Sequence, residues 1–322
     1  MSRYSDSTRA HRLDPESFAS GYFRNAVYRH WDPYEDIPQE LLEQDRERLV
    51  ESDISEPLFD GLRGTLAAFG AGEEAVTEDL APLSMRLDDV DKQLFVTTQI
   101  YEEAKHTAFF DRYWRAVVDP VAETKGFEVT APTDDRYFGE GYEELFDRTE
   151  AAMRELLEDD TDEALTRAYC HYHLAVESVL AQTGYYGIQA GYSPTGPDLG
   201  AEGGIHLEGL VEGIGYIRSD EGRHVGFGMH EVQRLVGEGV DPDIVSETLA
   251  DLLPLVADAV GPDPNAPTDG RGGLDPNALV EYASEKLARR IEVITDTTAE
   301  IPPVEELVSI GAGTDAGVAD DD

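Results

Sequence analysis

Long stretches of helical periodicity, separated by breaks rich in proline and glycine, most constrain how this 322-residue chain can fold. Apolar residues recur at three- and four-residue spacings, which is the pattern of a helix with one buried face. The predicted helices span 38–50, 56–84, 86–118, 141–157, 161–192, 204–236, 243–261 and 276–296. Strand-like alternation is nearly absent, and 128–130 is the best short candidate. The sequence therefore predicts an all-α fold, a bundle of long antiparallel helices.

The breaks between the helices define the predicted organisation. They fall at 120–137, 191–204 and 261–277, where prolines and glycines gather. Residues 1–37 are expected to form an irregular N-terminal arm, because Pro33 and Pro38 disfavour helix at the residues before them. The acidic segment 310–322 is expected to be disordered. We therefore predict a single helical domain over 1–309.

The net charge of −43 restricts the partners of the chain. Phosphates would be repelled, which excludes nucleic acid and an anionic membrane surface as partners. With only four lysines among so many carboxylates, the composition is typical of a salt-adapted protein, because salt screens the repulsion. The single cysteine, Cys170, rules out an internal disulfide or a multi-cysteine zinc site. Without an apolar run for a membrane span or a secretory signal, a cytoplasmic location is expected.

Two Glu-x-x-His motifs carry the chemistry, Glu103 with His106 and Glu221 with His224. Positions i and i+3 of a helix lie on one face, so the carboxylate and the imidazole of each motif can bind one metal ion. Chance would give close to one such pair in a chain of this composition, so the context of the motifs decides the matter.

Each motif follows a separate helical segment that carries another candidate glutamate, Glu73 before the first and Glu177 before the second. Glu177 lies in an otherwise apolar stretch, where a lone buried carboxylate would be costly unless a cation or a donor held it. The pattern Glu…Glu-x-x-His, repeated twice, gives four glutamates and two histidines. This is the ligand set of di-iron and di-manganese carboxylate proteins, which have a ferritin-like four-helix bundle core, here with additional helices. Hard oxygen ligands with imidazole suit manganese and iron.

Four sequence words extend this pattern: AGEEAVTED at 71–79, EEAKHT at 102–107, LAQTGYY at 180–186 and DEGRH at 220–224. They closely resemble those of the ligand-binding oxidases that share the fold of the ribonucleotide reductase small subunit. The resemblance covers roughly residues 20–300. It implies a homodimer with a mixed Mn and Fe centre, with Fe/Fe as the other composition. It also implies activation of O2 and a long-chain fatty acid bound in a hydrophobic channel.

The resemblance also assigns roles to single residues. Manganese would be bound by Glu73, Glu103 and His106, and iron by Glu177, Glu221 and His224, with Glu103 bridging the two ions. In the family a valine and a tyrosine near the metals become joined by an ether cross-link, and the matching positions here are Val76 and Tyr172.

The residues themselves support these two positions unequally. Val76 lies three residues after Glu73, so it shares a helical face with that ligand. Tyr172 lies five residues before Glu177, about 140° away around an ideal helix. A π-bulge within 172–177 would bring the tyrosine to the metals, and such bulges often occur at functional sites. Tyr185 and Tyr186 lie about two turns after Glu177, and Tyr185 is predicted to form a hydrogen bond near the cofactor, with core packing as the alternative role. His171 and His173 are interpreted as structural residues.

Three other functions are compatible with the double motif. A ribonucleotide reductase small subunit is the leading alternative, although its radical tyrosine usually lies four residues after the first motif histidine, where this chain has Phe110. Iron storage, as in ferritins, belongs to chains near half this length that assemble into cages. Acyl desaturases share the double motif, but the additional sequence words favour the oxidases.

Overall fold

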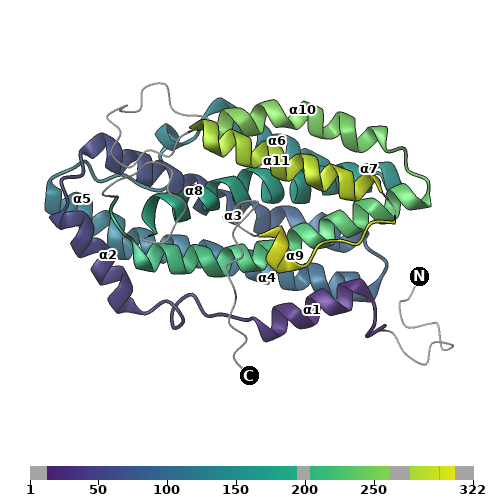
Figure 1. The fold of residues 1–322 in the computed structure, drawn as a ribbon, viewed down its shortest axis with the longest axis horizontal. Coiled ribbons are helices and arrows are strands. Elements are labelled where there is room, and N and C mark those ends of the chain that lie inside the picture. The colour runs from purple at the N-terminus through teal and green to yellow at the C-terminus, as the bar shows by residue number, and fades with distance from the viewer. Residues whose placement is uncertain (1–12, 194–203, 261–275, 297, 309–322) are drawn as a thin grey trace.

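The computed structural model describes residues 13–193, 204–260, 276–296 and 298–308. Within these ranges the regular elements are helices, without a strand, and the all-α prediction is confirmed (Figure 1). The α-helices are α1 (Phe18–Tyr28), α2 (Gln39–Glu51), α3 (Glu56–Arg86), α4 (Val90–Tyr113), α5 (Asp119–Lys125), α6 (Glu140–Glu155), α7 (Asp162–Tyr169), α8 (Gln182–Tyr192), α9 (Glu208–Glu238), α10 (Asp243–Val260), α11 (Pro276–Thr295) and α12 (Val304–Leu307). Two π-helices, η1 (Trp114–Val118) and η3 (Cys170–Ala181), and a 3₁₀ turn, η2 (Asp135–Tyr137), complete the set.

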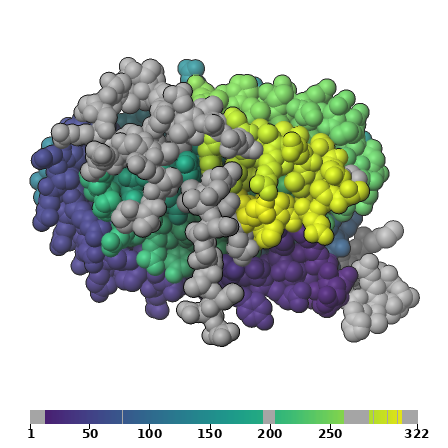
Figure 2. All heavy atoms as spheres, viewed as in Figure 1, coloured from purple at the N-terminus to yellow at the C-terminus, as the bar shows by residue number. Residues whose placement is uncertain are grey.

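Four long helical rods form the ferritin-like core: α3, α4, the continuous α7–η3–α8 segment and α9. Helices α6 and α10 pack against each other and against α3 and η3, and α11 packs against α9 and η3 (Figure 1). Helix α1 lies on the opposite side, against α4 and α9. In the space-filling view, α1 lies at the lower edge of the molecule, below the C-terminal helices (Figure 2). The core of the bundle is thus enclosed by helices on several sides.

Two clusters of buried apolar side chains fill the bundle. One gathers residues of α6, α7, η3, α9 and α10 around Phe95 and Phe227. The other lies toward α2, α5 and α8, around Phe59, Phe109 and Tyr185. Since both clusters use the periodic apolar residues of the long helices, hydrophobic burial fixes the direction in which the polar residues of those helices point.

The predicted irregular arm 1–37 is wrong over part of its length, because it contains α1. Ser17 caps this helix by accepting a hydrogen bond from the amide of Ser20. Its inner face buries Ala19 and Ala26, and Tyr22 packs against the apolar core, so the four-residue spacing of Phe18, Tyr22 and Ala26 was a helical signal that the two prolines outweighed in the prediction.

Two further boundaries differ from the prediction. Pro120 does not end the helical segment: it lies in the first turn of α5, which directly continues the π-helix η1. The predicted helix 161–192 is interrupted by the twelve-residue η3.

The candidate strand 128–130 is irregular. The tail 310–322 lies outside the described residues, and none of the described helices is both long enough and apolar enough to cross a bilayer.

Candidate metal centre

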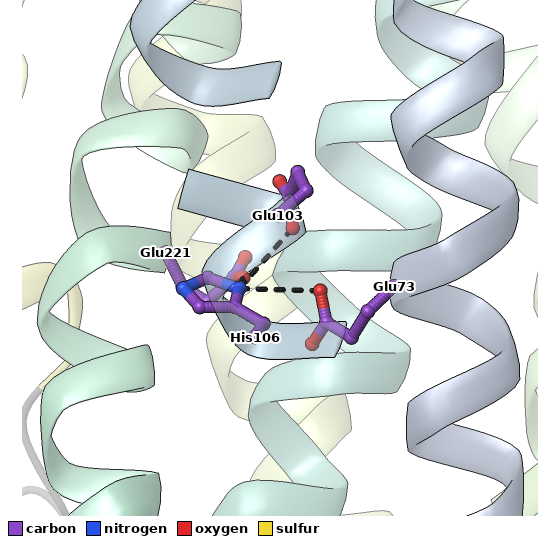
Figure 3. Close-up of side chains that lie close together, drawn as sticks. All are labelled: Glu73, Glu103, His106 and Glu221. Carbon is purple, nitrogen blue, oxygen red and sulfur yellow. Dashed lines mark hydrogen bonds and ion pairs between the residues drawn. The ribbon is translucent and has the colours of Figure 1, made fainter. Parts of the chain in front are cut away.

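Six side chains from four helical elements meet inside the bundle. Glu73 comes from α3, Glu103 and His106 from α4, Glu177 from η3, and Glu221 and His224 from α9. Their ligand atoms form two groups within which all atoms lie inside 4.8 Å of one another: Glu73, Glu103, His106 and Glu221 in the first, and Glu103, Glu177 and His224 in the second. Figure 3 shows the first group around the ring of His106. The two groups share Glu103, which the resemblance assigns as the bridge.

Distances around the two imidazoles define the centre. His106 Nδ1 lies 3.2 Å from both Glu73 Oε2 and Glu103 Oε2 (Figure 3). His224 Nδ1 lies 3.1 Å from Glu103 Oε1 and 3.4 Å from Glu177 Oε1. The carboxylate of Glu221 lies between the two rings, 3.5 Å from His106 Nδ1 and 3.8 Å from His224 Nδ1. Both histidines therefore direct Nδ1 at the centre of the carboxylate cluster.

Because the cluster is buried, its ionisable groups interact strongly and shift one another's pKa values. All six residues are at most 6% exposed. Burial raises the pKa of Glu73 and of Glu177 to about 7, and burial together with the charge of Glu103 raises the pKa of Glu221. Although burial opposes it, His224 and His106 hold the pKa of Glu103 well below its usual range. Without metal ions, the carboxylates of the cluster therefore bind protons. Bound cations would compensate the same negative charge instead.

The residues present fit a pair of metal ions. Two buried carboxylate oxygens, Glu177 Oε2 and Glu221 Oε2, have no hydrogen-bond partner within the described part of the chain. A buried acceptor without a donor is costly, and a cation bound between the carboxylates would satisfy both oxygens. Carboxylate oxygens with one imidazole per group form a donor set that suits manganese or iron.

The π-helix η3 carries the second half of the centre, and it confirms the predicted π-bulge. In a π-helix the backbone bonds run from i to i+5, so residues five apart face the same side. Tyr172 and Glu177 have this spacing, and the Tyr172 hydroxyl donates to Glu103 Oε1 at 3.1 Å. Tyr172 is fully buried, and Val76 is 5% exposed in the same apolar cluster. Both residues of the predicted cross-link are therefore buried in one apolar cluster, and Tyr172 contacts the shared ligand Glu103; the cross-link itself stays a prediction.

Tyr185 lies on the other side of the centre, in α8. Its hydroxyl donates to Glu73 Oε1 through a short hydrogen bond, and the ring stacks on Phe69 at 4.4 Å between centroids. A fully buried hydroxyl that holds one oxygen of a ligand carboxylate orients that carboxylate. The role of Tyr185 next to a cofactor stays a prediction, and this hydrogen bond supports it.

Sequence reasoning missed a crosswise pair of outer carboxylates. Each motif glutamate is preceded by another acid, Glu102 in the first motif and Asp220 in the second. Glu102 Oε2 lies 2.7 Å from Nε2 of His224, and Asp220 Oδ2 lies 3.1 Å from Nε2 of His106. The acid of each motif therefore accepts from the histidine of the other motif. This fixes the tautomer that leaves Nδ1 free for a metal ion.

These outer carboxylates are held in turn by buried cations. Arg223 joins both, with Nη2 2.5 Å from Glu102 Oε1 and in a short contact with Asp220 Oδ1. Asp220 Oδ2 also accepts from Lys105 Nζ at 3.0 Å and from Trp31 Nε1 at 2.7 Å. Because the hydrogen bond with His106 and the charges of His106, Arg223 and Lys105 favour the charged form, the pKa of Asp220 is lowered despite burial. The doubled acids of EE and DE were the only signal for this network in the sequence.

His171 and His173 are not among the clustered ligands, in agreement with the structural role expected for them. His173 is nevertheless fully buried, and its Nε2 lies 3.3 Å from Gln99 Oε1. The amide of Gln99 in turn donates to Glu177 Oε1 at 2.7 Å. Burial lowers the pKa of His173 to about 3, so this histidine is neutral and can support Gln99 without adding charge.

The bundle and its paired carboxylate–histidine groups define the class of ferritin-like di-metal carboxylate proteins. No protein-family model matches the chain. Among solved structures, a tyrosine-to-phenylalanine variant of an R2-like ligand-binding oxidase with aerobically reconstituted Mn/Fe cofactor matches with a TM-score of 0.71 and 29% identity, over 87% of this chain and 94% of that chain. A valine-to-leucine variant, also with Mn/Fe, matches with a TM-score of 0.72 and 28% identity over the same shares.

A glycine-to-leucine variant of such an oxidase carries an Fe/Fe cofactor and matches with a TM-score of 0.72 and 27% identity, over 87% of this chain and 94% of that chain. The structural neighbours of this chain are thus R2-like ligand-binding oxidases, which agrees with the resemblance found in the sequence words.

Proposed function

We propose that this protein is an oxidase that uses a mixed Mn/Fe centre to activate O2. The observation that carries the proposal is the pair of buried carboxylate–histidine groups with Glu103 in common. The Mn/Fe and Fe/Fe cofactors of the structural neighbours support the choice of metals. Two bound metal ions would supply redox chemistry that the side chains cannot perform alone.

We assign the ligand roles as the resemblance implies. Glu73, Glu103 and His106 would bind manganese, Glu177, Glu221 and His224 would bind iron, and Glu103 would bridge them. Tyr185 would orient Glu73. Glu102 and Asp220 would keep the two imidazoles in the tautomer that binds metal through Nδ1.

Spacing in the neighbours supports the other site residues. The neighbouring oxidases include variants substituted at adjacent glycine and glutamate residues, at a valine three residues after that glutamate, and at two tyrosines thirteen residues apart. Gly72, Glu73 and Val76 have the same spacing here, as do Tyr172 and Tyr185. These five positions are therefore our candidates for the residues around the reacting centre.

The chemistry proposed for Val76 and Tyr172 is an ether cross-link. Forming the C–O bond removes one hydrogen from the valine side chain and one from the phenol, two electrons and two protons in all. Bound metal ions would supply the two further electrons, and solvent two further protons, that reduction of one O2 to two water molecules requires. The hydrogen bond from Tyr172 to Glu103 gives the phenol a proton acceptor at 3.1 Å.

We further propose a long-chain fatty acid as ligand and a homodimer as the working form, both from the resemblance, and a cytoplasmic location from the composition. The ribonucleotide reductase alternative lacks its expected tyrosine. Phe110 occupies that position, where its ring is buried and stacks on Phe69 at 5.8 Å. A phenylalanine has no hydroxyl to oxidise, so the classical radical site is absent from that position.

Peptide mass spectrometry tests the proposal. Protein assembled with Mn, Fe and air should yield the peptide containing Val76 joined to the one containing Tyr172, lighter than their sum by two hydrogens. Protein assembled without oxygen should yield the two peptides separately. If both metals bind and air produces no joined peptide, the result contradicts the oxidase proposal. It then favours the alternative function, a ribonucleotide reductase small subunit.

A further inference from the structure

A groove of about 510 Å³ lies between α1 and α4, outside the metal centre. Phe23, Ala26 and Val27 line it from α1 and Leu94 and Thr98 from α4, so its walls are mainly apolar. Its volume lies within the range of small-molecule sites in proteins, which is roughly 300–1,000 Å³. Helix α1 runs along the edge of the bundle beside α4 (Figure 1).

The floor of the groove is formed by Glu102 and Lys105, and both are connected to the metal centre. Glu102 is one hydrogen bond, 2.7 Å long, from Nε2 of His224. Lys105 reaches His106 through Asp220 in two steps of 3.0 Å and 3.1 Å. A molecule in this groove would therefore be joined to both candidate metal sites through short, buried contacts.

Lys105 indicates the polar group that such a molecule needs. The ammonium group has three hydrogens, and its one hydrogen-bond acceptor in the described part of the chain is Asp220. The side chain is only 4% exposed, and Nζ otherwise faces the rings of Trp31 at 4.9 Å and Tyr101 at 5.6 Å. Buried donors of this kind are completed by an oxygen acceptor.

The local charges favour a neutral acceptor over a carboxylate. Lys105 and Arg223 carry two positive charges, which Glu102 and Asp220 already balance through the contacts described above. An added carboxylate would leave one negative charge uncompensated, in a chain whose net charge is −43. At the mouth, Tyr101 is 53% exposed and stacks with His30 at 5.9 Å, a surface suited to a flat ring.

We propose that the groove binds a quinol or quinone of one or two rings, with a ring oxygen directed at Lys105, and that this molecule is the electron donor of the metal centre. The role as donor rests on the oxidase function proposed above. A quinol that leaves as quinone gives up two electrons and two protons. Two bound, oxidised metal ions would each accept one of these electrons, and the two protons would pass to solvent.

Binding can be tested on metal-free protein, without reference to oxidase activity. The chain has two tryptophans, and in a Trp114→Phe background only Trp31, beside Lys105, reports by fluorescence. We expect 2-methyl-1,4-naphthoquinone to quench this signal to a plateau at micromolar concentration. Thr98→Phe and Ala26→Leu, which fill the groove from its two sides, should each weaken the apparent affinity at least tenfold.

Thr65→Phe is the matched control for Thr98→Phe. Both threonines are half-buried on long helices, and both donate Oγ1 to the carbonyl four residues earlier at 3.0 Å. Thr65 does not line the groove, so its variant should bind the quinone as the parent protein does. Quenching that stays linear without a plateau would overturn the proposal, as would unchanged affinity in properly folded Thr98→Phe and Ala26→Leu. Displacement of the quinone by decanoate, but not by decanol, would also overturn it, because the site would then select a carboxylate.

The donor role has its own measurement. In air-oxidised, metal-loaded protein, the reduced naphthoquinol should bleach the absorption of the centre at least tenfold faster in the parent and in Thr65→Phe than in Thr98→Phe. Equal rates would show that electrons enter elsewhere. Failure of the oxidase proposal is detected separately, by the missing joined peptide, whereas the fluorescence titration reports the groove alone.

Discussion

The two halves of the metal centre are built from different kinds of helix. The α3–α4 half, with Glu73, Glu103 and His106, lies on regular α-helices. The η3–α9 half, with Glu177, Glu221 and His224, takes one ligand from a twelve-residue π-helix, and its Glu221 also lies within the ligand group of the first half. Three- and four-residue spacing is therefore enough to assemble the first half. The second half needs a wider turn that ideal helix geometry does not predict.

The halves are nevertheless tied together at two levels. Glu103 belongs to both ligand groups, and the outer acids cross over, Glu102 to His224 and Asp220 to His106. Substitution of a residue that both halves share should therefore weaken metal binding in both halves. Substitution of a residue that belongs to one half should weaken metal binding in that half alone. The following predictions separate these cases.

The largest effect is expected at the shared ligand. Glu103→Ala should abolish tight binding of both metal ions. Each of the two ligand groups loses one carboxylate, and the two ions lose the carboxylate that would bridge them. Glu73→Ala and Glu177→Ala should each leave one ion bound. Metal content after gel filtration, measured by inductively coupled plasma mass spectrometry, checks this. One full equivalent of tightly bound metal in Glu103→Ala would contradict the shared role.

The crossover of the outer acids predicts an effect on the opposite motif. In the Glu177→Ala background, which keeps the α3–α4 half, Asp220→Asn should weaken metal affinity about 10- to 100-fold and Glu102→Gln should change it little. In the Glu73→Ala background the order should reverse. Competition with a fluorescent chelator gives both affinities. If each acid affects the histidine of its own motif, the crossed assignment is wrong.

The metal ligands could be predicted from the sequence, but the outer carboxylates Glu102 and Asp220 that hold the ligand histidines could not. Glu103 with His106, and Glu221 with His224, are related by helical spacing within one element. The contacts of Glu102 and Asp220 cross from α4 to α9, so they depend on how those helices are packed in register. In a chain with 68 acidic residues, the doubled acids carry no statistical weight by themselves.

The fold likewise has features that the sequence predicted and features that it did not. Long helices with one apolar face were predictable because burial repeats along them. Helix α1 was missed although Phe18, Tyr22 and Ala26 recur at four-residue spacing, because the prediction gave more weight to Pro33 and Pro38 in the arm that contains it. The length of η3 was also beyond reach, although the five-residue spacing of Tyr172 and Glu177 pointed to a local bulge. Sequence periodicity therefore locates helices better than it locates departures from them.

A smaller effect should distinguish the packing behind the two halves. At Gly228 of α9 an added Cβ would lie 2.2 Å from His173 Cβ of η3, an atom next to the backbone that cannot rotate away. At Gly72 of α3 it would meet the end of the Phe146 ring at 3.2 Å, which can shift. Gly228→Ala should therefore cost about 1–3 kcal/mol of unfolding free energy, and Gly72→Ala less than about 1 kcal/mol. Urea denaturation in high salt measures both. Equal losses would show that the η3–α9 contact is not the more rigid one.

Proton release should reveal what the halves have in common. Glu73 in one half and Glu177 in the other both have a pKa of about 7 without metal, raised mainly by burial. Metal binding requires the ionised carboxylates, so affinity should rise with pH through about 7, and binding at pH 6 should release protons. Calorimetry in buffers of different ionisation enthalpy counts these protons. Glu73→Gln and Glu177→Gln should each remove part of the release, and an unchanged count in both would contradict the raised pKa values.

The same shifts fix the sign of the stability change in metal-free protein. A carboxyl whose folded pKa exceeds its unfolded value near 4.5 contributes stability that is complete below pH 4.5 and lost as pH rises through about 7. Metal-free protein should therefore become less stable between these values, while metal-loaded protein should not follow this trend, because the cations replace the protons. Thermal melts across this range with and without chelator, at constant high salt, measure the difference. A metal-free form that gained stability over the same window would show that both carboxyls are held ionised by their neighbours, so that metal binding displaces no protons from either half.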